Sequence, residues 1–149
     1  MLAERLAHDL KDALKARDEV VVRTLRMLRT EIRYREDEVR RGLKPEEEVA
    51  CVRTAIQRRN DAAAQFRAGN REELAVAEEA EREVLLRYLP EQLDHVQIMA
   101  EIDGAIAELN AAGPRDFGKV MRAAMARIAG RADGATVSGL VRERLNAGA

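Results

Sequence analysis

The C-terminal stretch of the chain carries basic side chains that could bind an anionic ligand such as the phosphates of a nucleic acid. The acids from Asp116 onward are Asp116, Asp133 and Glu143, and the first two occupy positions where a helix would begin. Because an N-cap carboxylate is engaged by backbone N–H groups, we expect the outer surface to be net positive. The basic residues of this stretch are Lys119, Arg122, Arg127, Arg131, Arg142 and Arg144.

A second set of basic residues lies near the N-terminus: Arg23, Arg26, Arg29 and Arg33. At 100° per residue they would span about a third of a helix circumference, so they could follow a phosphate backbone. The alternative is ion pairing with Glu31, with Glu36 or with a neighbouring helix. We favour ion pairing here, because exposed runs of charge usually serve only solvation.

The segment 113–120 reads GPRDFGKV and matches the pattern of a phosphate-binding loop, G-x-x-x-x-G-K. However, Val120 stands where such a loop needs Ser or Thr for Mg²⁺, and the segment follows a predicted helix instead of a strand. We therefore interpret it as a Gly-Pro linker followed by a capped helix.

Metal binding and nucleophilic catalysis find little support in the sequence. The two histidines, His8 and His95, are far apart, and the single cysteine, Cys51, adds no ligand pair. Ser138 is the only serine, and the spacing places no His or Asp beside it. The paired glutamates fall on predicted exposed helix faces. We predict no catalytic residue, no metal site and no cofactor.

The elements that position these residues are predicted to be helices. Strong helix formers dominate, aromatic residues make up only 3%, and no run alternates with the period of a strand. Leu2, Leu6, Leu10 and Leu14 form an apolar stripe of the first helix, and Ala77 is predicted to face inward on the fourth. The predicted helices cover approximately 3–16, 19–41, 45–68, 71–89, 94–112, 116–130 and 133–145.

Leu89-Pro90 is predicted to be a domain boundary, because proline lacks the backbone N–H and disfavours helix at the preceding residue. We expect an all-α fold in which residues 1–89 form a long-helix hairpin or bundle. Residues 90–149 would form a small three-helix C-terminal domain that contains Ile98, Ile102, Ile106 and Leu109 in its core.

Polar residues and glycines indicate where several helices begin and end. Asp18, Asp116 and Asp133 are predicted N-caps, and Asp94 with Gln97 has the form of a capping box. Gly130 is predicted at positive φ, where it closes a helix. On this basis Asp116→Ala would cost about 1 kcal/mol through lost capping.

Several segments resemble the GatB/YqeY family. The run Phe117–Met121, the link Gly130–Asp133 and the helix with Val137, Leu140, Val141 and Leu145 resemble its tail domain, which closes the B subunit of the bacterial glutamyl/aspartyl-tRNA amidotransferase. Arg26-Met27-Leu28 within LRMLRTEI, and Tyr88–Leu93, resemble the free-standing YqeY-like members. The likeness covers nearly the whole chain.

The resemblance implies a tRNA-binding accessory protein associated with glutamine-dependent carbon–nitrogen ligation. In that chemistry an amide nitrogen from glutamine, the amido-N donor, is moved onto misacylated tRNA. The large catalytic part of the B subunit is missing from this chain, so we expect no self-contained active site. By the resemblance, tRNA or a tRNA amidotransferase or synthetase is the expected partner. The expected RNA contacts are Lys119, Arg122, Arg131 and Arg142.

The rival hypothesis is a structural or protein-interaction module whose N-terminal helices dock a partner or a second copy. The basic arc of residues 23–33 and the incomplete apolar stripes motivate this alternative. The charged N-terminus and the absence of a long uncharged run predict a cytoplasmic protein without a signal peptide or membrane anchor.

Overall fold

The computed structural model describes residues 1–147, and this range is all-α: seven α-helices, one short 3-10 helix and no strand. The predicted fold class is confirmed. The chain divides into two compact units, which meet in sequence at Leu89 and Pro90 and are described separately below. None of the helices in the described range combines the length and the hydropathy that crossing a bilayer requires.

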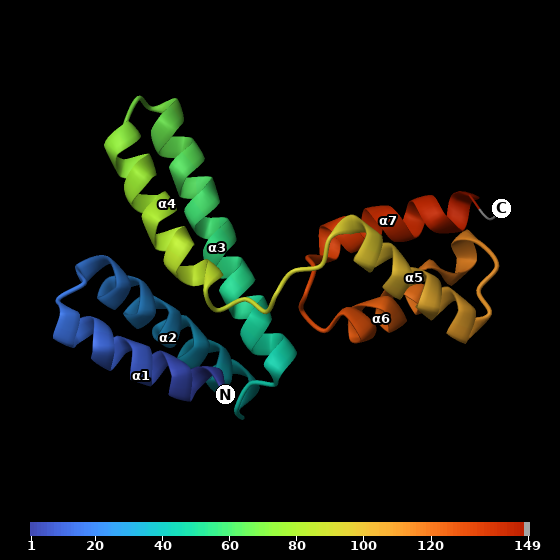
Figure 1. Ribbon diagram of the computed structural model, residues 1–149, viewed down its shortest axis with the longest axis horizontal. Coiled ribbons are helices and arrows are strands. Elements are labelled where there is room, and N and C mark those ends of the chain that lie inside the picture. The colour runs from blue at the N-terminus through green and yellow to red at the C-terminus, as the bar shows by residue number, and fades with distance from the viewer. Residues whose placement is uncertain (148–149) are drawn as a thin grey trace. The chain divides into compact units, whose positions relative to one another are not determined.

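The first unit consists of two helical hairpins (Figure 1). Its helices are α1 (Leu2–Ala16), α2 (Glu19–Val39), α3 (Pro45–Ala68) and α4 (Glu72–Leu86). Asp18 caps α2 as predicted, because its carboxylate accepts a hydrogen bond from Val21 N at 3.3 Å. Pro45 is the first residue of α3, where its missing N–H is not needed.

The core of the first unit is aliphatic, and the most buried side chains are Leu6, Leu25, Leu28, Val52 and Leu85. Two predicted inward positions are wrong. Leu14 is 48% exposed, and Ala77 is exposed whereas Ala75 is fully buried. At both positions a nearby alanine faces inward instead, Ala13 on α1 and Ala75 on α4, so the buried face is rotated from the one that the apolar pattern predicted.

One ion pair lies inside the first unit. The Nε of Arg59 on α3 donates to a carboxylate oxygen of Glu81 on α4 at 3.0 Å, and both side chains are less than a tenth exposed. Arg23 on α2 donates to the other oxygen of Glu81 at 2.8 Å. Three helices are therefore joined by one buried carboxylate. For Arg23 the favoured interpretation, pairing with a neighbouring helix, is confirmed.

The end of the first unit is tied back to α1 through Tyr88. The Tyr88 hydroxyl donates to Asp9 at 2.6 Å, and the Arg5 guanidinium lies 4.6 Å from the centre of its ring. Burial and the Asp9 carboxylate hold the pKa of Tyr88 well above its usual value. The phenol therefore remains a hydrogen-bond donor throughout the physiological pH range.

The turn between α2 and α3 is closed by Arg41 and Glu47. Two guanidinium nitrogens of Arg41 each donate to one carboxylate oxygen of Glu47 at 2.8 Å, and Lys44 N donates to the same carboxylate. These donors favour the ionised form, first Arg41 and then the Lys44 backbone, and lower the pKa of Glu47 to about 2.

A lowered folded-state pKa means that this carboxylate stabilises the turn fully above its unfolded pKa of about 4.3 and loses that contribution as the pH falls toward 2. We expect the Glu47 carboxyl carbon to titrate near 2 in an NMR experiment. Arg41→Ala should move this pKa up toward the ordinary range, whereas Arg40→Ala, next to it, should leave it unchanged. A Glu47 that titrates normally in the native chain would contradict the Arg41 pairing.

The second unit contains α5 (His95–Leu109), the 3-10 helix η1 (Pro114–Asp116), α6 (Phe117–Ile128) and α7 (Gly134–Ala147). The predicted capping box at the start of α5 is confirmed: Gln97 N donates to Asp94 at 2.8 Å, and Asp94 N donates to the Gln97 side chain at 3.0 Å. Leu109, predicted to face inward, is 40% exposed at the last turn of α5. The core residues with the least exposure are Ile102, Ala105, Val120, Ala124, Ile128, Val137 and Val141.

The caps of α6 and α7 match the prediction except at Asp116. This residue is the N-cap of α6, but its carboxylate makes no bond to the first turn and instead accepts from Ala112 N at 3.0 Å. Ala112 N, which precedes η1, is the donor that competes for this carboxylate. The predicted capping hydrogen bond of Asp116, which was the reason given for the cost of Asp116→Ala, is therefore wrong. Gly130 has φ 83°, as predicted, and Asp133 accepts from Thr136 N at 2.9 Å and so caps α7.

Candidate nucleic-acid interface

Lys119 and Arg122 lie on the outer face of α6. The inner face of this helix buries Val120, Ala124 and Ile128, and the spacing of three residues places the two cations together on the opposite side. Both side chains are exposed, and neither has an acidic partner within residues 1–147. They are therefore available to an anionic ligand.

Arg142 on α7 contacts the first residue of α6. Its guanidinium lies 5.1 Å from the centre of the Phe117 ring, and Phe117 is the first residue of α6. Arg142 remains exposed and lines a groove of about 300 Å³ together with Pro114, Leu145 and Asn146. The stacking on Phe117 holds the guanidinium in place without neutralising its charge.

Arg131 does not join this group. It follows the C-terminal end of α6, a helix of 12 residues and hence about 18 Å long. Its guanidinium folds back on that end and donates to the carbonyl oxygens of Ile128 at 2.8 Å and Arg127 at 2.9 Å. A cation on the last carbonyls of a helix is a recognised C-terminal stabiliser, so Arg131 has a structural role of its own.

Arg115 is a basic residue at this surface that the sequence analysis did not select. It lies in η1, immediately before α6, and is exposed without an acidic partner in the range that the structure describes. The spacing of four and three residues between Arg115, Lys119 and Arg122 is a signal that could have selected it, although Arg115 lies in η1 and outside the α-helical repeat of α6. We define the α6 basic end as Arg115, Lys119, Arg122 and Arg142.

Two arginines of the expected positive rim are neutralised by α5. Arg144 donates to both carboxylate oxygens of Asp103, at 2.7 and 2.8 Å, and this hydrogen-bonded carboxylate raises the pKa of Arg144. Arg127 donates to Glu101 at 3.1 Å and Glu108 at 3.4 Å. Counting acids only from Asp116 onward missed these partners. The positive surface is thus smaller than the sequence predicted and is concentrated at the α6 basic end.

Comparison with known proteins gives one result for this chain. The family model described as "Yqey-like protein" matches residues 3–145. The chain belongs to the YqeY-like family. The resemblance proposed from the sequence is thereby confirmed, and the match extends across both units. No curated protein matches the chain.

In this YqeY-like chain, the segments that carried the resemblance have clear structural roles. Leu93 N donates to the Arg131 carbonyl at 2.7 Å, and the Gln92 side chain donates to the Gly130 carbonyl at 3.3 Å. The segment before α5 is thus held against the link between α6 and α7. Arg26 and Met27, in contrast, are exposed on α2, whereas Leu28 is buried.

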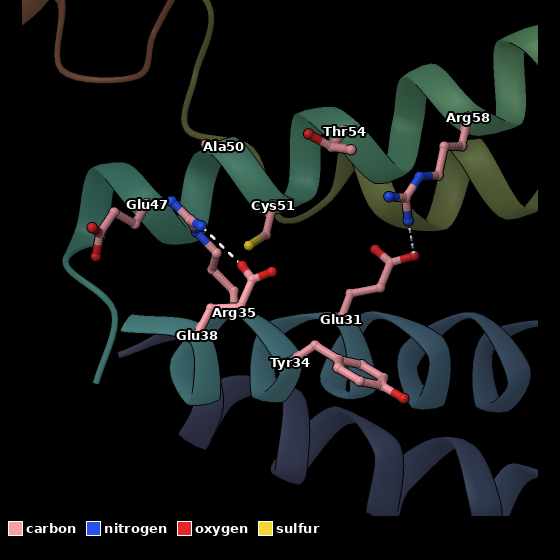
Figure 2. Close-up of a pocket in the computed structure, with 9 residues that line it drawn as sticks. All are labelled: Glu31, Tyr34, Arg35, Glu38, Glu47, Ala50, Cys51, Thr54 and Arg58. Atoms are coloured by element: carbon pink, nitrogen blue, oxygen red, sulfur yellow. Dashed lines mark hydrogen bonds and ion pairs between the residues drawn. The ribbon is translucent and has the colours of Figure 1, made fainter. Parts of the chain in front are cut away.

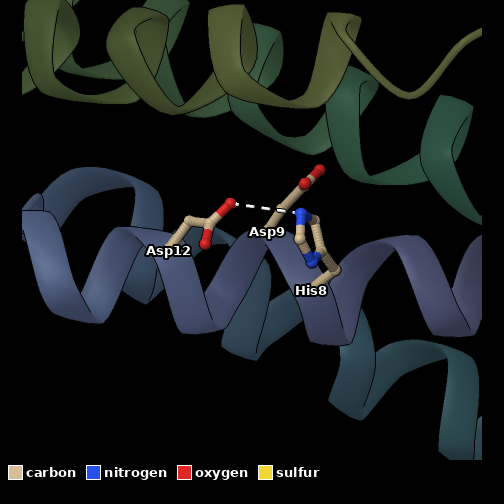
Figure 3. Close-up of side chains that lie close together, drawn as sticks. All are labelled: His8, Asp9 and Asp12. Carbon is tan, nitrogen blue, oxygen red and sulfur yellow. Dashed lines mark ion pairs between the residues drawn. The ribbon is translucent and has the colours of Figure 1, made fainter.

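A histidine and two aspartates lie close together on α1 (Figure 3). His8 and Asp12 form an exposed pair, with 3.2 Å between His8 Nε2 and a carboxylate oxygen of Asp12. Asp9 is already engaged by the Tyr88 hydroxyl. Three ligand atoms on one open helix face, of which one is occupied, are less than a zinc site needs, so we assign no metal to this cluster.

Cys51 on α3 points toward α2 and lines a groove of about 510 Å³ (Figure 2). Burial is the main reason that the pKa of this thiol is raised. A thiol that stays protonated is a poor nucleophile. The groove is bordered by the Arg58–Glu31 and Arg35–Glu38 ion pairs, both at 2.9 Å, so its charged groups are already satisfied.

Proposed function

We propose that this YqeY-like chain is a tRNA-binding accessory protein that works with glutamine-dependent carbon–nitrogen ligase (tRNA amidotransferase) chemistry. Family membership supports the class of protein. The observation that carries the proposal is the α6 basic end, four exposed cations in η1, in the first half of α6 and on α7 beside Phe117, none of which has an ion-pair partner in the described chain.

The net charge of the whole chain is −1, so attraction to RNA must come from such a local surface. In the first unit, Arg26, Arg29 and Arg33 likewise have no acidic partner in the described residues, but Arg41, Arg58 and Arg67 are paired with glutamates. The α6 basic end contrasts with these neutralised pairs. It is the part of the second unit best suited to approach a phosphate backbone.

The kind of contact follows from the side chains. Lysine and arginine bind phosphates without reading sequence, and the Phe117 ring is covered by Arg142 and offers no free platform for a base. Binding should therefore be salt-sensitive and tolerant of sequence. In this proposal the ligase chemistry itself belongs to a partner enzyme, and this chain contributes RNA contacts.

We expect the variant Lys119→Ala/Arg122→Ala/Arg142→Ala to bind bulk tRNA more weakly than the native chain at low salt. Each lost phosphate contact reduces the slope of log K against log salt by about 0.7–0.9, so the triple variant should lose about 2–3 from the slope. Filter binding over a salt series measures this change.

The matched control is Arg58→Ala/Arg67→Ala/Arg71→Ala, which removes the same number of charges from ion pairs of the first unit. Its slope should match that of the native chain. Arg131 is the fourth of the residues that the sequence analysis expects to contact RNA. Its guanidinium would have to give up its hydrogen bonds to the Ile128 and Arg127 carbonyl oxygens to do so, and Arg131→Ala tests for this contact. Equal slopes for the native chain and the Lys119/Arg122/Arg142 variant would contradict the proposal.

A further inference from the structure

A groove on the first unit lies between the C-terminal end of α1 and the N-terminal half of α2. Its volume is about 490 Å³. We call its apolar lining residues the floor and its charged lining residues, which are mostly basic, the border. The lining residues are Leu14, Arg17, Glu19, Val22, Arg23, Arg26 and Met27.

Two large apolar side chains of the floor are partly exposed to solvent, in the same groove that the arginines line. Leu14 is 48% exposed and Met27 is 41% exposed. Methionine and arginine are enriched at protein interfaces, and methionine adapts its shape to an apolar partner. Covering these two side chains would therefore stabilise a complex.

The border of the groove carries an excess of positive charge. Arg17 and Arg26 have no acidic partner in the described residues, Arg23 is paired with Glu81, and Glu19 is the one acid among the lining residues. The positive surface continues along α2 through Arg29 and Arg33, and Arg26, Arg29 and Arg33 have no acidic partner in the described part of the chain. The sequence analysis favoured ion pairing for the four arginines of residues 23–33. This interpretation holds for Arg23 but not for the other three arginines.

The buried ion pair of the first unit holds the groove in shape. Glu81 fixes Arg23 on the border at 2.8 Å. The same carboxylate fixes Arg59, whose other nitrogen donates to the Met27 sulfur on the floor at 3.6 Å. One buried carboxylate therefore orders both the charged border and the apolar floor, which lowers the entropy cost of binding.

We propose that this groove binds an acidic amphipathic helix of a protein partner. Such a helix presents apolar residues at i, i+3, i+4 and i+7 to the floor, and glutamates or aspartates beside them to the arginines. An RNA would use the arginines but leave Leu14 and Met27 uncovered, so the combination of apolar floor and basic border favours the peptide. This inference concerns the first unit and does not depend on tRNA binding.

The probe is a labelled helical peptide of about 14 residues, or four turns, with leucines on one face and glutamates beside them. Fluorescence anisotropy with the full chain should show saturable binding. Arg17→Glu/Arg26→Glu should weaken this binding about tenfold or more, and Leu14→Ser/Met27→Ser should weaken it to a similar extent. A peptide with lysines in place of the glutamates should bind at least tenfold more weakly.

The matched control is Arg115→Glu/Arg122→Glu, an equal charge reversal on the second unit, which should leave peptide affinity unchanged while lowering tRNA affinity. Absence of saturable binding, or equal binding by the groove variants, would overturn the proposal. Loss of tRNA binding but not of peptide binding in Arg17→Glu/Arg26→Glu would assign the surface to nucleic acid instead. A dimer that these substitutions dissociate would identify a second copy as the occupant and would also overturn it.

Discussion

Replacement of Glu81 by alanine is expected to destabilise the first unit by about 3–5 kcal/mol, because it leaves the Arg59 charge buried without its main partner. The Arg59 side chain is 7% exposed, and its next carboxylate, Glu78, is 3.8 Å away and 26% exposed. Water cannot replace the lost partner at such low exposure. Urea denaturation, followed through signals from the first unit, measures the loss.

Two further variants separate the buried charge from a general effect of losing a glutamate. Glu83→Ala, two residues away, breaks an exposed pair with Arg82 and should cost less than about 1 kcal/mol. Arg59→Met combined with Glu81→Leu removes both charges and should be much closer to native stability than Glu81→Ala alone. If the double variant were as unstable as the single one, packing and not charge would explain the loss.

Gly130→Val is expected to cost about 1–3 kcal/mol in the second unit. Gly130 has φ 83°, a region in which a β-branched side chain is strongly strained. The strained backbone would lie at the link between α6 and α7, where the Gly130 and Arg131 carbonyl oxygens accept hydrogen bonds from the segment before α5. Denaturation monitored through amides of the second unit is the appropriate measurement, since a chain of two compact units need not unfold in a single step.

A substitution at the neighbouring Ala129 is a control with the opposite expected effect on the stability of the second unit. Ala129 also has positive φ, 53°, and pays the steric cost of a Cβ in that conformation. Ala129→Gly should therefore stabilise the second unit, by up to about 1 kcal/mol. Gly130→Asn should cost less than Gly130→Val, because asparagine tolerates the left-handed region. Equal stabilities of all three variants would mean that the backbone at this link is not constrained.

The helical fold could be predicted because apolar residues recur at helical spacing and because caps such as Asp18, Asp94 and Asp133 are local signals. The buried pair of Arg59 and Glu81 could not be predicted. In sequence, both residues resemble members of an exposed charged helix face. Their burial depends on how α3 and α4 face each other, which is a tertiary property.

The candidate site was predictable in part, for a related reason. The outward orientation of Lys119 and Arg122 follows from the period of α6 alone. The pairing of Arg127 and Arg144 depends on acids of α5 that are distant in sequence. The folding back of Arg131 depends on helix-end geometry, and Asp116 lost its predicted cap to the competing Ala112 N–H. Long-range partners decide which cations remain available.

The most direct test of the central claim is an NMR titration of the ¹⁵N-labelled full chain with tRNA at low salt. The α6 basic end should respond most, with the largest changes at the amides of residues 115–122 and around Arg142, and these changes should diminish as salt is added. Changes confined to residues 1–89, or no change at the α6 basic end at any tRNA concentration, would contradict the proposed RNA surface.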